Sequence, residues 1–289
     1  MARIEKLVIV GVGLIGGSFA LALKEAGAVG RAVGVGRGAG NIRRALELGI
    51  IDAAGAFDQA TFGDADLVLL AVPVGQMQTV MRAIAPLIGP KTVVTDAGST
   101  KQDVVALARR ELKGAFSRFV PGHPVAGTEK SGADAAFAGL YRGRRVVLTP
   151  LEATEPEALA LVRAAWERCG ASVFELRPRE HDAVMASVSH LPHVLAYALV
   201  DQVARHKNAQ QLFSYAAGGF RDFTRIAASH PEMWRDICLA NKKALLAELV
   251  RYGGKLERVK RMLERGDARA LHALFSGARE ARDRWLKDT

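Results

Sequence analysis

The chain has 289 residues and a formal net charge of +10, and 49% of its residues are hydrophobic and 24% charged. This length suits two domains, and the mixture excludes disordered and fibrous classes. We expect a cytoplasmic protein with no signal peptide and no membrane partner, because no uninterrupted apolar run reaches the ~20 residues that span a bilayer.

The basic charge is scattered in short pairs such as Arg43-Arg44 and Lys260-Arg261, and aromatic residues make up only 6%. Single-strand nucleic-acid binders interleave basic and stacking residues, so we expect no nucleic-acid partner. An enzyme acting on anionic small molecules is the simpler interpretation. The two cysteines, Cys169 and Cys238, lack the spacing of a metal site or a redox pair, which fits a reducing compartment.

The N-terminal part alternates strand and helix patterns. Apolar runs predict strands at 6–10, 31–36, 66–72 and 92–95, and helical periods predict helices at 14–26, 42–48 and 76–87, with Asn41 as the cap of the second. Further strands are predicted at 118–120, 145–148 and 172–175, with a helix at 155–169. Buried strands that alternate with helices predict an α/β domain with a Rossmann-type, doubly wound parallel sheet.

The pattern changes from about His181 onwards. Helical periods cover 181–205, 233–253, 256–265 and 268–287, and the pair Gly218-Gly219 predicts a turn. We therefore predict an N-terminal domain over 1–178 and an all-helical domain over 179–289, with the boundary near Arg177-Pro178-Arg179.

The first strand-to-helix turn, 11–16, reads Gly-Val-Gly-Leu-Ile-Gly. Gly11 suits the tight turn, Gly13 lets the backbone approach a pyrophosphate, and Gly16 lets the helix pack on the strand. The free N–H groups and partial positive charge of a helix N-terminus favour phosphate. Because a strand precedes the turn and a helix follows it, the pattern predicts a dinucleotide site rather than an ordinary tight turn. The predicted cofactor contacts are Gly11, Gly13, Leu14, Ile15, Gly16, Gly36, Arg37, Val72 and Pro73.

The second strand ends at Val35-Gly36-Arg37, where an NAD enzyme usually carries an acid for the ribose 2′-hydroxyl. No acid stands there, and Arg37 can bind a 2′-phosphate. We therefore predict NADP as the favoured cofactor, with NAD as the alternative in which Arg37 is a solvated surface residue.

Four segments together carry a resemblance. They are GVGLIGGSFA at 11–20, DAGSTK at 96–101, PGHPVAGTE at 121–129, and SHLPH at 189–193 followed by GGFRDFTRIA at 218–227. In this order they are similar to the prephenate/arogenate dehydrogenase family of tyrosine biosynthesis. The resemblance covers nearly the whole chain.

The resemblance implies oxidative decarboxylation of prephenate or arogenate by a homodimer formed through the helical domain. A base must take the ring hydroxyl proton as hydride leaves, and other groups must hold the carboxylates. The family's catalytic positions fall on His123, Ser99 and His193. Its substrate-binding positions fall on Arg225, Ser189, Thr128 and Trp234, and Glu129 follows the His123 motif towards the pocket entrance.

The residues leave local alternatives open. His123 could be structural in its Gly-His-Pro turn, and Ser99 could cap the helix that starts near Gln102. Arg225 could belong to a surface ion pair, because Arg221 and Asp222 stand close by in the sequence. Trp234 could lie in the core or at a subunit interface, and His190 could lie in the pocket or in the core.

Two other functions are compatible with the same domain architecture but would need different residues. A β-hydroxyacid dehydrogenase would use a lysine such as Lys242 or Lys243 as its base, and the His123 motif would have no role. A dinucleotide-sensing protein without turnover would need neither His123 nor Arg225. His190 and His193 have helical metal-ligand spacing, but no third ligand is evident and hydride transfer needs no metal. We predict no metal site.

Overall fold

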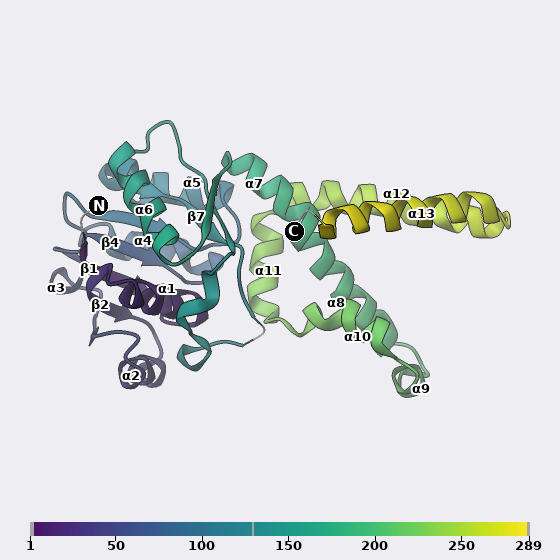
Figure 1. The fold of residues 1–289 in the computed structure, drawn as a ribbon, viewed down its shortest axis with the longest axis horizontal. Coiled ribbons are helices and arrows are strands. Elements are labelled where there is room, and N and C mark those ends of the chain that lie inside the picture. The colour runs from purple at the N-terminus through teal and green to yellow at the C-terminus, as the bar shows by residue number, and fades with distance from the viewer. Residues whose placement is uncertain (1–2, 129, 288–289) are drawn as a thin grey trace. The chain divides into compact units, whose positions relative to one another are not determined.

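A six-stranded parallel sheet forms the centre of the larger part of the chain. The computed structural model describes residues 3–128 and 130–287, which divide into the compact units Met1–Lys242 and Lys243–Thr289. The strands are β1 (Ile4–Val10), β2 (Val29–Val35), β3 (Ala53–Ala54), β4 (Leu67–Leu70), β5 (Val93–Asp96) and β6 (Phe119–Val120). Their order, β3-β2-β1-β4-β5-β6 with every pairing parallel, confirms the predicted Rossmann-type sheet (Figure 1).

Helices cover both faces of this sheet. They are α1 (Leu14–Glu25), α2 (Ala39–Glu47), α3 (Gln59–Phe62), η1 (Val74–Gln76), α4 (Met77–Ile84), α5 (Gln102–Glu111), η2 (Lys113–Arg118), η3 (Ala133–Ala135), η4 (Ala138–Tyr141) and α6 (Pro156–Arg168). Strand side chains alternate between two apolar cores, so that Leu7 and Ile9 join one and Val8 and Val10 the other. The short β3 and α3 have no counterpart among the predicted elements.

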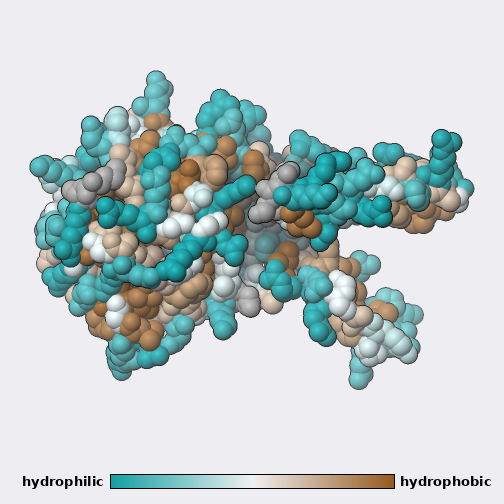
Figure 2. Space-filling view, in the orientation of Figure 1, coloured by the Kyte–Doolittle hydropathy of each residue, from teal (hydrophilic) through white to brown (hydrophobic). Residues whose placement is uncertain are grey.

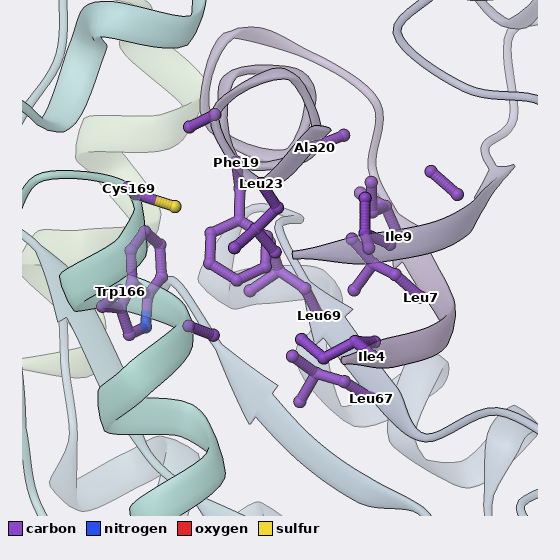
Figure 3. Close-up of a cluster of buried hydrophobic side chains, with 14 of the residues drawn as sticks. Ile4, Leu7, Ile9, Phe19, Ala20, Leu23, Leu67, Leu69, Trp166 and Cys169 are labelled. Atoms are coloured by element: carbon purple, nitrogen blue, oxygen red, sulfur yellow. The ribbon is translucent and has the colours of Figure 1, made fainter. Parts of the chain in front are cut away.

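The first core is formed by α1 and α6 against the sheet. Phe19 and Leu23 of α1 lie beside Leu69 of β4, with Trp166 of α6 close by (Figure 3). The Phe19 and Trp166 ring centroids are 4.5 Å apart, and both side chains are fully buried. This packing holds α1, which begins at the glycine turn, against the sheet.

Three strands form a second, separate sheet. β7 (Gly122–Pro124) pairs antiparallel with β8 (Arg145–Leu148), and β8 pairs parallel with β9 (Ser172–Glu175). The sequence predicts β8 and β9 but not β7, because Gly-His-Pro is typical of a turn. His123 thus lies on a strand, opposite Val147.

Within the described residues, the chain after β9 is mainly helical. The larger unit ends with α7 (Pro178–Met185), a π-helical segment (Ala186–His190), α8 (Leu191–Ala204), α9 (Ala209–Ser214), α10 (Gly218–Thr224), η6 (Arg225–Ala228) and α11 (Pro231–Ala240). The smaller unit contains α12 (Lys242–Glu264) and α13 (Ala268–Lys287), joined by a turn at Gly266, where φ is +62°. The predicted helices 233–253 and 256–265 are wrong in their limits, because the break lies at Asn241 and α12 runs through Gly253-Gly254. Gly218-Gly219 begins α10 and is not a turn.

One continuous helix, from Pro178 to Ala204, is long and apolar enough to cross a membrane by length and composition alone. Its most apolar 18-residue window has a mean hydropathy of 1.5, and 28% of that window is buried. The count of uninterrupted apolar residues misses this helix, because polar residues such as His193 interrupt the run. The same helix carries the buried polar side chains His181, Asp182 and His190.

Candidate active site

The glycine turn has the geometry of a phosphate-binding turn. Gly11 has φ +100°, and a Cβ there would lie 2.3 Å from the carbonyl oxygen of Ala71. A Cβ on Gly16 would lie 2.3 Å from the Gly11 carbonyl oxygen, so α1 packs closely on the turn. Beside Gly13 the nearest atom to such a Cβ is the Gly132 nitrogen, at 4.0 Å. The turn therefore needs its first and third glycines, and it leaves open space at the second.

The other predicted cofactor residues lie at the carboxyl ends of three adjacent strands. Gly36 and Arg37 follow β2, Leu14 and Ile15 begin α1 after β1, and Val72-Pro73 follow β4. Ligands of open α/β sheets bind at this edge. Arg37 is exposed, and none of the ion pairs among residues 3–128 and 130–287 involves it. Its guanidinium is free to meet a ligand.

Asn41 does not cap α2, which begins at Ala39 with Gly38 as its N-cap. Its side chain instead joins two loops. Asn41 Nδ2 donates to the Val12 carbonyl at 2.6 Å, and its Oδ1 accepts from the Ala133 N–H at 2.8 Å. The middle of the glycine turn is thereby tied to the segment that follows the His123 motif. The cap prediction was wrong because the short amide side chain of an asparagine can serve either as a helix N-cap or as a hydrogen-bonded bridge between two loops.

His123 contacts a second histidine that the sequence did not single out. Its Nδ1 lies 2.8 Å from Nε2 of His181, and the two rings meet edge to face with centroids 5.0 Å apart. Lost hydration lowers the pKa of His123 well below its usual value, and the nearby His181 and Lys101 act in the same direction. His123 is therefore neutral near physiological pH, as a general base must be.

A buried ion pair holds the start of β7. Lys101 Nζ lies 2.5 Å from Asp96 Oδ2 and donates to the Gly122 carbonyl at 2.6 Å, and neither charged side chain is exposed. The other carboxylate oxygen of Asp96 accepts from the Gly122 N–H at 3.1 Å. The end of β5 and the residue before His123 are thus fixed to each other by one lysine and one aspartate.

Asp182 of α7 caps α5 from outside. Its two carboxylate oxygens accept from the N–H groups of Lys101 and Gln102 at 2.8 and 2.9 Å, and Oδ1 also lies 2.9 Å from Nδ1 of His181. Burial works to raise the pKa of Asp182, but these donors outweigh it and the pKa lies below its usual range. The alternative that Ser99 caps this helix is wrong, since the N-cap residue is Lys101 and Asp182 supplies the acceptor. Ser99 remains partly exposed in the loop between Asp96 and Lys101.

The helical side of the site brings four predicted residues together. His193 Nδ1 lies 2.9 Å from the Ser189 carbonyl, and its ring stacks on Trp234 at 3.6 Å between centroids. Burial lowers the pKa of His193, and the nearby Arg225 charge adds to this. Arg225 is exposed, and none of the ion pairs between described residues uses it. Trp234 is 8% exposed, packs into the second core, and its Nε1 has no hydrogen-bond partner among the described residues.

His190 lies in the core rather than in an open pocket. It is 1% exposed, and its Nδ1 lies 3.1 Å from Asn241 Nδ2, which also donates to the Asp182 carbonyl. Nδ1 of His190 therefore contacts Asn241, and Nδ1 of His193 contacts the Ser189 carbonyl. Within the described residues no group of three His, Cys, Asp or Glu side chains could hold a metal ion.

Thr128 lies away from these contacts. It is exposed and lines a hollow of about 320 Å³ together with Val125–Gly127, Phe137, Gly139, Leu140, Arg142 and Arg144. Its hydroxyl accepts from the Lys130 N–H at 3.2 Å. Glu129 lies outside the described residues. Thr128 is therefore beside the His123 strand in the chain, but the structure gives it no contact with His123 or His193.

Sequence reasoning missed His181, Asp182, Lys101 and Asn241. One signal was present in the sequence, because His181-Asp182 places two polar residues near the start of a long apolar helix. Such residues are buried only when they are paired. The partners lie 58 residues away for His181 and about 80 for Asp182, so only the fold identifies them.

The buried histidines predict loss of stability in mild acid. Burial lowers the pKa values of His123, His181 and His190, in the last case to about 4, whereas an unfolded histidine titrates near ~6.5. The unfolded chain then binds more protons below about pH 6.5, so the free energy of unfolding falls with falling pH. Denaturant titrations at about pH 8 and pH 5 will measure this, and equal unfolding free energies would contradict it.

Known proteins are similar to this chain over almost its whole length. The family model of the prephenate dehydrogenase nucleotide-binding domain matches residues 19–175, and that of the prephenate dehydrogenase dimerization domain matches residues 177–277. Prephenate dehydrogenase of Bacillus subtilis is 37% identical over 281 residues, covering 96% of this chain and 76% of the relative. Cyclohexadienyl dehydrogenase of Zymomonas mobilis is 37% identical over 287 residues, covering 98% and 96%.

Two solved structures share the fold at high similarity. Prephenate dehydrogenase from A. aeolicus, in complex with hydroxyphenyl propionate and NAD+, has a TM-score of 0.90 and 36% identity, and the match covers 99% of both chains. Synechocystis arogenate dehydrogenase has a TM-score of 0.82 and 31% identity, covering 97% of this chain and 100% of that one. The chain belongs to the prephenate dehydrogenase family.

Proposed function

We propose that the protein catalyses oxidative decarboxylation of prephenate, arogenate or both, with hydride transfer to a nicotinamide dinucleotide, in tyrosine biosynthesis. The observation that carries this proposal is His123, a neutral base fixed at the edge of the sheet where the glycine turn also lies. Family membership supports the reaction class. We also propose residues 1–178 and 179–289 as the functional domains, although α7–α11 pack into the same compact unit as the sheet.

The glycine turn fits a dinucleotide, since open space lies beside Gly13 and the first N–H groups of α1 have no side-chain cap. A bound nicotinamide supplies the hydride acceptor. His123 takes the proton of the ring hydroxyl, and Ser99 lies in the adjoining loop, where it can donate to the same oxygen. Arg225, His193, Ser189 and Trp234, whose ring stacks on His193, are assigned to the substrate's carboxylates and side chain, and Thr128 lies farther out.

Spectroscopic turnover tests the proposed reaction. Purified protein with prephenate or arogenate and NADP or NAD should produce reduced nicotinamide, detected by its absorbance. Turnover of neither substrate with either cofactor would refute the proposal. A β-hydroxyacid dehydrogenase would retain activity without His123 and depend on a lysine, but Lys242 and Lys243 are both exposed. A sensor without catalysis would bind the dinucleotide and give no reduced product.

We propose that Arg37 favours NADP over NAD. Its exposed guanidinium lies at the end of β2, next to the N-terminus of α2, whose first N–H groups have no side-chain cap. Both features favour a 2′-phosphate. Replacing Arg37 with Ala is expected to lower kcat/KM for NADP by about tenfold to a hundredfold, the worth of a charged hydrogen bond, and to leave NAD almost unaffected.

Arg31→Ala is the matched control for this prediction, because Arg31 is exposed on the same strand but near its amino end. Steady-state kinetics with both cofactors measure the effect. A wild-type preference for NAD, or an equal loss for both cofactors in Arg37→Ala, would contradict the assignment.

Arg225 is proposed to bind a substrate carboxylate, because its planar guanidinium suits a two-point contact. Arg225→Gln is expected to raise KM for the cyclohexadienol by about tenfold or more with a smaller change in kcat, since it removes a contact made already in the ground state. Arg221→Gln removes an exposed charge one helical turn earlier and serves as the control. An unchanged KM in Arg225→Gln would remove Arg225 from the substrate site.

We propose that the protein is a homodimer formed through its helices. α13 has 20 residues, none of them buried, and α12 exposes Leu246, Val250, Leu256 and Leu263. A helix with no buried face is marginal on its own, so a second copy is the expected cover. Figure 2 shows apolar side chains at the surface of this helical pair.

Light scattering during gel filtration measures the assembly. A mass of twice the 30.9-kDa chain is expected, and Val250→Asp, at a position that is 76% exposed, should reduce it towards that of one chain. A wild-type monomer would refute the dimer. A Val250→Asp protein that stays dimeric would place the interface away from this face of α12.

A further inference from the structure

Two side chains of α7 control the environment of His123 without reaching the reacting atoms. His181 is fully buried, with one ring nitrogen facing Asp182 at 2.9 Å and the other facing His123 at 2.8 Å. The three residues therefore form one chain of contacts from a carboxylate through one imidazole to the next. This arrangement decides where each proton can be.

The proton positions follow from the carboxylate. Asp182 accepts from two backbone N–H groups and from Gln102 Nε2, and its lowered pKa keeps it ionised. An ionised carboxylate only accepts, so Nδ1 of His181 must carry a proton. Burial lowers the pKa of His181, and a neutral His181 then has no proton on Nε2. That bare nitrogen can only accept, so His123 Nδ1 must donate to it.

We infer that His181 and Asp182 are positioning residues that hold His123 in the tautomer protonated at Nδ1, which makes Nε2 the atom that accepts the substrate's proton. This inference rests on the proposed function for its chemical consequence, although the tautomer itself does not. A neighbour that fixes the tautomer of a catalytic imidazole determines which of its nitrogens acts as the base.

The reverse arrangement is disfavoured. It would place a proton on His181 Nε2 and leave its Nδ1 lone pair facing the Asp182 carboxylate. A doubly protonated His181 would relieve that contact, but burial and the nearby Lys101 charge oppose it. The charged and titratable groups around His123 are His181 and Asp182 on α7, Lys101 paired with Asp96 before α5, and His190 in the π-helical segment.

The same contacts support the proton transfer. As hydride departs with the electron pair of the ring C–H bond, the hydroxyl O–H bond breaks, its electron pair forms the carbonyl, and the proton bonds to Nε2 of His123. The resulting imidazolium keeps its Nδ1 proton directed at His181 Nε2. The Asp182 carboxylate, on the far side of His181, stabilises the positive charge that His123 has gained.

The tautomer can be measured directly on the whole protein without substrate. The chain has seven histidines, so ¹⁵N-histidine labelling and two-bond ¹H–¹⁵N spectra at neutral pH resolve each ring, and His123→Asn assigns the His123 signals. For His123 we expect the ¹⁵N chemical shift of a protonated nitrogen at Nδ1 and that of an unprotonated nitrogen at Nε2. The opposite pattern in the wild-type protein would overturn the inference.

Two variants test the consequence for catalysis. His181→Leu removes the acceptor and should lower kcat by about tenfold to a hundredfold, part of the ~10²–10⁴-fold that a general base supplies, while KM and cofactor affinity stay unchanged. His181→Gln keeps an acceptor oxygen and should recover part of the lost kcat. His206→Leu, at an exposed position, is the control.

The outcomes separate this inference from the proposed reaction. A His181→Leu protein that is folded by circular dichroism, with wild-type kcat and an unshifted acid limb of kcat/KM, would refute the positioning role. If His181→Leu does not fold, the tautomer spectrum of the wild type and the kcat of His181→Gln still test the positioning role of His181. Absence of turnover in the wild type would refute the proposed reaction and leave the tautomer result standing.

Discussion

The His123→Asn variant is expected to lose about 10²–10⁴-fold in kcat while binding the dinucleotide as tightly as the wild type. Asparagine has nearly the same size and can still meet His181 Nε2 through its amide N–H, so the contact at 2.8 Å can be kept. It cannot accept a proton at neutral pH. The loss therefore measures the base and not the fold.

The pH dependence gives this prediction its direction. Burial and the neighbouring His181 and Lys101 lower the pKa of His123, so the unprotonated base persists below the usual histidine value of ~6.5. Activity per folded molecule should fall on the acid side only as the pH passes this lowered value. In His123→Asn the residual kcat should show no such acid limb.

Steady-state kinetics and cofactor titration by fluorescence measure the two quantities separately. A His123→Asn variant with kcat within about threefold of the wild type would remove His123 from the chemistry and return it to a structural role in β7. Weakened dinucleotide binding with kcat retained would place His123 at the cofactor. Neither result would change the fold, which rests on the two cores.

The glycine turn shows how much could be predicted from the sequence. Gly11, Gly13 and Gly16 were identified from spacing because the turn, the phosphate approach and the helix packing are local demands, and φ at Gly11 and the contacts of Gly16 agree. The parallel sheet followed for the same reason, since apolar strands and helical periods are local patterns. β7 escaped because pairing with β8, not its own three residues, makes it a strand.

The contacts of His123 show where prediction from sequence ended. His123 itself was found through the family motif, but its contact with His181 joins two segments 58 residues apart.

The predicted limits of α12 were wrong for another reason. Two adjacent glycines favour a helix end by intrinsic propensity, yet a Cβ on Gly253 or Gly254 would meet nothing within 4 Å, and the helix continues.

The Lys101→Met variant is expected to lower the free energy of unfolding by about 3–5 kcal/mol. Lys101 and Asp96 are both fully buried, so removing the ammonium leaves a carboxylate with no counter-charge inside the protein. The N–H groups of Gly98 and Gly122 still donate to Asp96, which limits the loss but does not supply a charge. Adding Asp96→Asn removes the uncompensated charge and should recover part of the stability.

Denaturant titration at a fixed protein concentration measures these changes, because assembly would otherwise add to them. The control is Lys24→Met, which breaks the 2.6 Å pair with Asp52 at the surface and should cost less than about 1 kcal/mol. A Lys101→Met loss as small as the Lys24→Met loss would show that water reaches Asp96. The Lys101 charge also lowers the pKa of His123, so any folded Lys101→Met protein should show its acid limb of kcat at higher pH than the wild type. One buried ammonium would then be shown both to fix the strand that carries the base and to keep that base unprotonated.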